Sequence, residues 1–361
     1  MPKKLIICAD GTWNTQDDAD NGMPCPTNVE CLARSLRSEA AGGVPQVVYY
    51  HSGVGTNWGF SLRGGALGRG LWANVLDCYR FLVHNYCQGD QLYIFGFSRG
   101  AYTARSLAGL VRNSGILARG HEDYENEAVA LYRDNDPSTA PDSDRCKKLR
   151  AEHSVEAETE IDFIGVWDTV GALGIPGLSG TFHFLKQLDW AFHDVKLSTK
   201  VKRARQALAI HEHRMEFLPT KWELQAGDTA DPQKLKQVWF TGAHSDIGGG
   251  YPAHGLSDVA LRWMLDEAKE AGLSFGMDAL PHFAADGNAD PHDSFSTIYK
   301  VIDFFRGHPK GAGREWKPSA LTCEDIHPSV VERYKKKIKG DFWPETFVPE
   351  LERRAAAVAP R

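Results

Sequence analysis

The sequence lacks any long apolar run. No stretch approaches the roughly 18 residues that a membrane-spanning helix needs, and the first apolar run, residues 5–9, ends at Asp10. This run is also short for the apolar region of a secretory signal peptide. We therefore expect no membrane span and no signal peptide. The chain is expected in the cytoplasm unless a signal-independent secretion system exports it, and peripheral contact with a membrane stays open.

Patterned cysteines and an excess of basic charge are also missing. The seven cysteines form no Cys-x-x-Cys pair and no Cys/His spacing typical of structural zinc. Lys and Arg number 41 against 47 Asp and Glu, for a net charge of −6. Proteins that bind nucleic acid usually carry a positively charged face. We expect reduced thiols, no metal site and no nucleic-acid partner.

The chain does contain enough apolar material for a large core. It has 361 residues, of which 42% are hydrophobic and 24% charged, as in ordinary globular proteins. Short apolar runs predict buried strands over 4–9, 47–50, 92–97, 161–167 and 238–243. Apolar residues at helical spacing predict helices over 28–37, 71–87, 100–112 and about 257–271. This alternation predicts an α/β fold, a mainly parallel sheet with helices on both faces.

The predicted organisation is a single domain over residues 1–361 with two insertions. Residues 120–160 are rich in charge, Asp, Pro and Ser, and residues 172–235 begin with a mixture of Gly, Pro and aromatics. We expect both as lid-like insertions above the carboxyl edge of the sheet, where insertions often shape a substrate pocket. The segment 275–361 is less regular in pattern.

The strongest local signal is Gly96-Phe97-Ser98-Arg99-Gly100. This G-x-S-x-G sequence stands between a predicted strand and a predicted helix, which is the context of a nucleophile elbow. The elbow strains the serine backbone, and the flanking glycines avoid clashes of a Cβ with neighbouring elements. The following helix points its positive end at the site, so the N–H of Arg99 is expected to donate to an oxyanion.

A serine nucleophile needs a base and an acid that orients the base. Asp168 and His244 each follow a predicted strand, in the chain order Ser, Asp, His that is typical of the α/β-hydrolase fold. In a parallel sheet both would lie at the same carboxyl edge as Ser98. Asp246 paired with His327 is the alternative. Strand-end placement favours Asp168 and His244, and the sequence leaves the other pair open.

Further site residues are expected around the first strand end. Gly11 and Thr12, in the Asp10-Gly11-Thr12 turn, are candidates for shaping the oxyanion hole, and Asp10 for contacting substrate. Asp-Gly-Thr also occurs in haloacid-dehalogenase phosphatases, but their nucleophilic aspartate would stand at Cys8. The glycine-rich run 64–70 lacks the Lys-Ser/Thr of a phosphate-binding loop. Within it, Arg69 is a candidate for binding an anionic group of the substrate.

A resemblance to a known family covers roughly residues 3–265. Its motifs are Ala9 to Asn14, Tyr93 to Arg105, Trp167 to Val170 and Gly242 to Tyr251. Together they resemble the α/β-hydrolase family of type VI secretion phospholipase effectors, long catalogued as a domain of unknown function. The resemblance implies a Ser-Asp-His esterase or phospholipase and supports Ser98, Asp168 and His244 in those roles.

The predicted function is therefore a serine hydrolase that cleaves acyl ester bonds, with a lipid or phospholipid favoured over a small ester. It requires no metal or organic cofactor. Two alternatives stay open: a short-chain carboxylesterase, and a non-catalytic binding or scaffold protein that keeps the hydrolase fold. The sequence defines neither the acyl chain, the head group nor the oligomeric state.

Overall fold

The architecture is known from a computed structural model of the chain. It describes residues 2–11, 19–20, 22–53, 65–134, 136–170, 196–214, 217–225, 231–280, 282–294, 313–338 and 340–357. The strands are β1 (Lys4–Ala9), β2 (Ala19–Asp20), β3 (Met23–Pro24), β4 (Glu39–Ala40), β5 (Val44–His51), β6 (Gln91–Phe97), β7 (Phe163–Trp167), β8 (Ala204–Ala209), β9 (Leu235–Phe240) and β10 (Glu324–Ile326). The helices are α1 (Asn28–Ser35), α2 (Gly65–Asn85), α3 (Arg99–Ser114), α4 (Glu125–Arg133), α5 (Asp144–His153), α7 (His244–Gly248), α8 (Gly255–Glu270), α10 (Pro328–Lys336) and α11 (Val348–Ala357).

Eight of these strands form one sheet in the order β10-β9-β8-β7-β6-β1-β5-β4. Every neighbouring pair is parallel except β4 and β5, while β2 and β3 form a separate antiparallel pair. The predicted α/β class with a mainly parallel sheet is confirmed. Because parallel strands end at one edge, the residues that follow β1, β6, β7, β8, β9 and β10 gather there.

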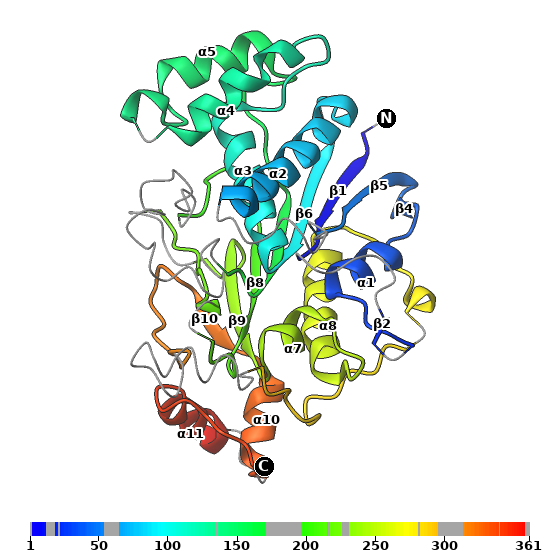
Figure 1. Cartoon of the computed structure of the whole chain (residues 1–361), viewed down its shortest axis with the longest axis vertical. Helices are drawn as coiled ribbons and strands as arrows, with labels where there is room; N and C mark the ends of the chain where they lie inside the picture. The colour runs from blue at the N-terminus through cyan, green and yellow to red at the C-terminus, as the bar shows by residue number, and fades with distance from the viewer. Residues whose placement is uncertain are drawn as a thin grey trace.

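Both faces of the sheet are covered by helices, as Figure 1 shows. Alternate residues of β1 point to opposite faces: Leu5 and Ile7 pack with residues of α2 and α3, whereas Ile6 and Cys8 pack with residues of α1 and α8. Strand side chains alternate in this way because the pleat has a period of two residues. β1 is therefore apolar on both faces, which explains its continuous apolar run.

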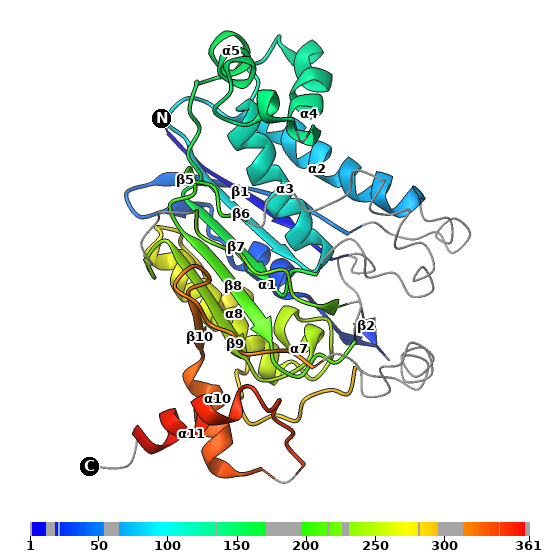
Figure 2. The ribbon, with the colours of Figure 1, turned by 90° about the vertical axis from the view of Figure 1, so that its left-hand side faces the viewer.

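A third cluster extends the core towards the end of the chain. Trp239 of β9 and Ile326 of β10 pack with Val330 of α10, with Leu351 of α11 and with Phe347, which directly precedes α11. Residues 275–361 have a less regular sequence pattern, yet they contribute the edge strand β10 and the helices α10 and α11, which pack beside it. Figure 2 shows α10 and α11 next to the β10 side of the sheet.

The structure corrects the prediction of two insertions above the carboxyl edge. Within 172–235, residues 204–209 form β8, a fully buried strand between β7 and β9. Within 120–160, α4 and α5 pack against the C-terminal end of α3, where Ser114 Oγ donates to the carbonyl of Ala128. Because α3 begins at the carboxyl edge and runs away from it, these helices lie at the opposite end of the sheet (Figure 2).

The helices in the described part of the chain include none that combines the length and the apolar character needed to cross a membrane.

Candidate active site

Ser98 lies on a strained turn between β6 and α3. Its φ is 57° and its ψ is −118°, a region that non-glycine residues rarely adopt. A Cβ on Gly96 would lie 2.3 Å from the carbonyl oxygen of Gly100, and one on Gly100 would lie 2.1 Å from that of Ala9. Both glycines are therefore required for the close approach of β6, α3 and β1. This is the geometry expected of a nucleophile elbow.

The backbone around Ser98 is fixed on both sides. Its N–H donates to the carbonyl of Trp167 at 3.1 Å, and its carbonyl accepts from the N–H of Tyr102 at 3.3 Å. The first bond ties the elbow to the end of β7. The second begins α3, whose first residue is Arg99. The peptide dipoles of this 16-residue helix favour negative charge at its N-terminus.

Asp168 directly follows β7 and is completely buried. Its Oδ1 accepts from the N–H of Ala209 at 3.1 Å and from Nη1 of Arg314 at 3.0 Å. Its Oδ2 accepts from Nη2 of Arg314 at 2.9 Å and from Nδ1 of His244 at 2.7 Å. Burial raises the pKa of Asp168, but the charge of Arg314 and the contacts with His244 overcome this and bring it to about 2. The carboxylate is therefore ionised at neutral pH.

His244 is the first residue of α7, which follows β9. Its ring packs against Phe97, with centroids 4.6 Å apart, and edge-on against Phe217 at 5.0 Å. Phe97 immediately precedes Ser98, so the imidazole lies beside the elbow. Burial lowers the pKa of His244, and the hydrogen bond and charge of Asp168 oppose that effect. Within the described residues, Nε2 of His244 is buried and has no hydrogen-bond partner.

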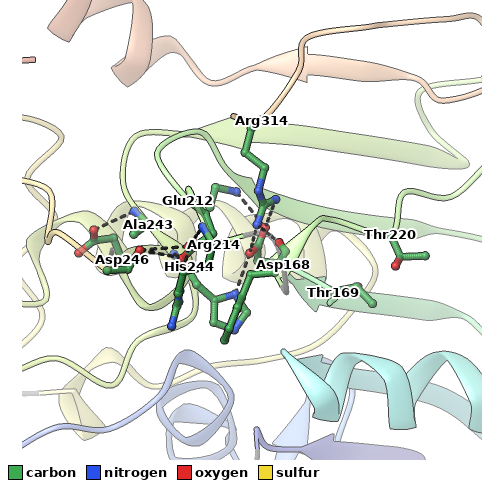
Figure 3. Close-up of polar contacts among 12 residues, drawn as sticks. Asp168, Thr169, Glu212, Arg214, Thr220, Ala243, His244, Asp246 and Arg314 are labelled. Atoms are coloured by element: carbon green, nitrogen blue, oxygen red, sulfur yellow. Dashed lines mark hydrogen bonds and ion pairs between the residues drawn. The ribbon is translucent and has the colours of Figure 1, made fainter. Parts of the chain in front are cut away.

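A second acid, Glu212, contacts the backbone of His244. Glu212 follows β8, and its Oε2 accepts from the backbone N–H of His244 at 3.2 Å. Arg214 forms two side-chain bonds with Glu212, at 2.9 and 2.8 Å. Burial raises the pKa of Glu212, but the contacts with Arg214 bring it to about 2. This pair holds the start of α7 in place, as Figure 3 shows together with Asp168 and Arg314.

The structure does not bring the alternative pair together. Asp246 bonds through Oδ1 to Nδ1 of His292 at 2.6 Å and through Oδ2 to the N–H of Ala243 at 2.9 Å. His327 caps α10, where its Nδ1 contacts Oγ of Ser329 at 2.8 Å. Asp168 and His244 are thus in contact with each other, whereas Asp246 and His327 each have another partner.

Of the other predicted site residues, the structure describes Asp10 and Gly11 but neither Thr12 nor the side chain of Arg69. Asp10 is 2% exposed, and its carboxylate accepts from Thr27, Tyr50 and the N–H of Gly11. All three contacts are internal, so Asp10 holds the end of β1 to β5 and α1, and the N–H of Gly11 is engaged by Asp10 itself. Thr12 and the side chain of Arg69 lie outside the described residues.

A well-formed cavity is lined by residues of α1 and α8. Its volume is about 560 Å³, and its lining includes Cys31 of α1, Leu261 of α8 and Phe283. None of Ser98, Asp168 and His244 lines it. The cavity is therefore not the place where Asp168 and His244 meet.

Sequence reasoning missed several residues of the site. Glu212 could have been found had residues 204–209 been recognised as a strand, because it follows that strand at the carboxyl edge. That strand contains alanine, arginine, glutamine and one leucine, and none of the β-branched or aromatic residues that mark a strand in the sequence, which hid it. Arg314 has no local signal, since it follows Gly313 in a segment without helical or strand periodicity.

The chain was compared with known proteins. A family model described as T6SS, phospholipase effector Tle1-like, catalytic domain, matches residues 3–267. The uncharacterized protein YEL023C of Saccharomyces cerevisiae is 28% identical over 237 residues, which are 60% of this chain and 32% of that protein. This chain thus spans only about a third of the length of that relative.

Two solved structures are similar at low sequence identity. One is the Tle1 effector bound to the VgrG spike from the type 6 secretion system, with a TM-score of 0.46, 16% identity, and coverage of 88% of this chain and 82% of that chain. The other is an uncharacterized protein from Pseudomonas aeruginosa, with a TM-score of 0.46, 16% identity, and coverage of 100% and 60%. The family match confirms the resemblance seen in the sequence motifs. The chain therefore belongs to the family of Tle1-like phospholipase effector catalytic domains of type VI secretion systems.

Proposed function

We propose that this protein is a serine hydrolase that cleaves acyl esters of lipids, with phospholipids as the favoured class. The observation that carries the proposal is the hydrogen bond of 2.7 Å between Asp168 and Nδ1 of His244. The buried Nε2 has no hydrogen-bond partner among the residues that the structure describes, and the ring packs against Phe97, which precedes Ser98. An imidazole held in this way has the tautomer of a general base, with its lone pair on Nε2. Family membership supports the lipid substrate.

In the proposed mechanism, Nε2 of His244 accepts the proton of the Ser98 hydroxyl as Oγ attacks the ester carbonyl. The negative charge that develops on the carbonyl oxygen is stabilised at the N-terminus of α3, with the N–H of Arg99 as one donor. His244 then returns its proton to the leaving alkoxide. Water hydrolyses the acyl-serine through the same base. Asp168 stays ionised throughout and stabilises the imidazolium.

Four further residues have proposed roles beside the elbow or in substrate binding: Gly11, Thr12, Asp10 and Arg69. Thr12 stays our candidate for a second oxyanion donor, because it follows the end of β1, which touches the elbow at Gly100. Gly11 contributes to the shape of this turn through its bond to Asp10. Asp10 acts on substrate only through this loop. Arg69 stays a candidate for the anionic group of a phospholipid.

Labelling of the nucleophile tests the proposal. A fluorophosphonate probe should label the wild type and fail to label Ser98→Ala. Ser114→Ala is the matched control, because Ser114 ends the same helix, is fully buried, and its hydroxyl donates to the carbonyl of Ala128. Labelling of the control at the wild-type rate is expected. Folded wild-type protein that resists the probe would instead support a non-catalytic binding protein.

Turnover of a substrate panel separates the enzyme classes. We expect release of fatty acid from phospholipid vesicles by the wild type and the Ser114→Ala variant, with loss in Ser98→Ala. Hydrolysis of soluble butyrate esters with no action on vesicles would replace the phospholipase by a short-chain carboxylesterase. The vesicle assay also measures peripheral membrane contact, by co-sedimentation of the inactive Ser98→Ala protein.

The description of the family extends the proposal to delivery. We propose that the chain leaves the producing cell through a type VI secretion system. Secretion of a tagged chain by a strain with a working system, and its loss when the system is disabled, is the expected result. Equal release from both strains would contradict it.

A further inference from the structure

Three residues beyond the family match reach acids at the carboxyl edge of the sheet. The match ends at residue 267. Further along the chain, Nδ1 of His292 bonds to Asp246, Oγ of Ser294 bonds to Glu212, and the guanidinium of Arg314 bonds to Asp168. The C-terminal part of the chain is therefore built into the candidate site rather than appended to the hydrolase core.

The contact between Arg314 and Asp168 is the most deeply buried of the three. Both side chains are completely buried, and the two nitrogens of the guanidinium fork meet the two carboxylate oxygens at 3.0 and 2.9 Å. Nη2 also donates to the carbonyl of Phe217 at 2.6 Å. This links Arg314 to a residue whose ring packs against His244. Only arginine offers two parallel donors in a fixed plane, so the carboxylate cannot rotate without losing a bond.

Arg314 and His244 share one acceptor. Oδ2 of Asp168 lies 2.9 Å from Nη2 of Arg314 and 2.7 Å from Nδ1 of His244 (Figure 3). The guanidinium charge therefore offsets part of the negative charge that would stabilise a protonated imidazole. In the triad of a serine hydrolase, the aspartate pairs with the imidazole alone. Here the Asp168 carboxylate lies between the imidazole of His244 and the guanidinium of Arg314, which is always positively charged.

The other charged groups near His244 are each paired with another residue. Glu212 accepts from its backbone N–H and is itself paired with Arg214, while Asp246, on the same helix, is bonded to His292. The rings of Phe97 and Phe217 cover two sides of the imidazole. Among the described charged groups, Asp168 is the one that bonds to the imidazole ring, and Arg314 is linked to the ring through Asp168.

We propose that Arg314 is a positioning residue of the catalytic centre, which fixes the Asp168 carboxylate against Nδ1 of His244 and keeps His244 in its neutral, proton-accepting form. This rests on the proposed function, in which His244 is the general base. Arg314 touches neither substrate nor the reacting atoms. It acts through Asp168.

Two substitutions separate its two effects. Arg314→Lys keeps a positive charge but loses the fork, so kcat should fall about 10- to 100-fold with KM and the acid limb of the pH profile little changed. Arg314→Met removes the charge as well. Because the charge of Arg314 then no longer offsets that of Asp168, the pKa of His244 should rise and the acid limb of kcat/KM should move up by about one pH unit.

A matched control distinguishes this role from a general need for buried arginines. Arg205 is also buried and bonds to a carboxylate, Glu267, at 2.5 Å, but it lies near the start of β8, at the opposite end of the strand from the site. Arg205→Lys should lower the melting temperature and leave the pH profile of kcat/KM unchanged. Circular dichroism and thermal melting identify any variant that fails to fold.

NMR titration of the His244 ring gives a readout without turnover. In protein labelled at histidine, the His244 resonance is assigned by its loss in His244→Ala, and its midpoint should rise in Arg314→Met relative to wild type and Arg205→Lys. If Arg314→Met does not fold, the loss of kcat at an unchanged acid limb in Arg314→Lys still supports the proposal. Folded Arg314 variants with wild-type kcat and an unmoved His244 midpoint would overturn it. Hydrolysis that survives Ser98→Ala would instead refute the proposed function. The NMR titration would still test whether Arg314 lowers the pKa of His244, because it does not depend on turnover.

Discussion

Oδ2 of Asp168 contacts Nδ1 of His244 at 2.7 Å although 76 residues separate them in the sequence and β8 lies between the strands that precede them. The backbone of Asp168 makes this possible. Its φ is 37°, a left-handed conformation that is rare for a non-glycine residue. The turn directs the carboxylate across the end of β8, where the N–H of Ala209 bonds to Oδ1. Strain at Asp168 thus accompanies strain at Ser98, and both occur at the predicted site.

Asp168→Asn should damage both activity and stability. An amide carries no charge to stabilise the imidazolium and presents an NH₂ group to one of its present donors, so we expect kcat to fall about 10³- to 10⁴-fold. The buried guanidinium of Arg314 would also lose its counter-charge, which should lower the free energy of unfolding by about 3–5 kcal/mol. Steady-state hydrolysis and urea denaturation measure the two effects. A variant as stable as wild type would contradict the buried ion pair.

His327→Ala should leave most of the turnover intact, within about threefold of wild type. Nδ1 of His327 caps α10 and its ring stacks on Phe240 at 4.6 Å, so its loss should cost about 1 kcal/mol of stability. His244→Ala should cost nearly as much activity as Ser98→Ala, and the double variant little more, because a nucleophile and its base act as a unit. If His327→Ala abolished hydrolysis and His244→Ala did not, the Asp246 and His327 pair would take over the proposed roles.

Much of the fold could be predicted because buried strands and amphipathic helices leave strong patterns. β1 and β6 were predicted to within a residue, since their apolar runs end abruptly at Asp10 and Ser98. β8 was not, because alanine, arginine and glutamine fill a strand whose two faces are covered by neighbouring elements. Its arginine and glutamine are buried with hydrogen bonds to Glu267 and the carbonyl of Thr220. Such pairing by distant partners leaves no local pattern.

The same distinction applies to the candidate site. Ser98, Asp168 and His244 could be proposed because each follows a strand, and strand ends are readable from the sequence. Arg314 and Glu212 act through contacts that span 146 and 32 residues. Only the folded chain defines those contacts. The role of Asp10 also depends on the fold, since burial beside Thr27 and Tyr50 turns an expected substrate contact into an internal one.

Ser98→Gly should be more stable than Ser98→Ala while both are inactive. The φ of 57° and ψ of −118° strain any residue with a Cβ, whereas glycine adopts them freely. Relief of strain of about 1–3 kcal/mol exceeds the extra chain entropy of glycine in the unfolded state, about 0.4–1 kcal/mol. We expect a net gain of about 1 kcal/mol, measured by chemical denaturation. Equal stability of the two variants would show that the elbow is relaxed in solution.

Asp10 should make the protein less stable as the pH rises through weakly acidic values. Burial raises the pKa of Asp10 from 3.8 to about 6, against the opposing hydrogen bonds from Thr27, Tyr50 and Gly11. Between these two values the folded protein holds a proton that the unfolded chain has released, so the free energy of unfolding falls with rising pH, by about 3 kcal/mol in all. Asp10→Asn should remove this fall when the two proteins are denatured with urea at a series of pH values. Tyr50→Phe deletes one of the bonds to the carboxylate, so its fall should extend to higher pH than in wild type. A wild-type curve that stays parallel to that of Asp10→Asn across this range would contradict the raised pKa.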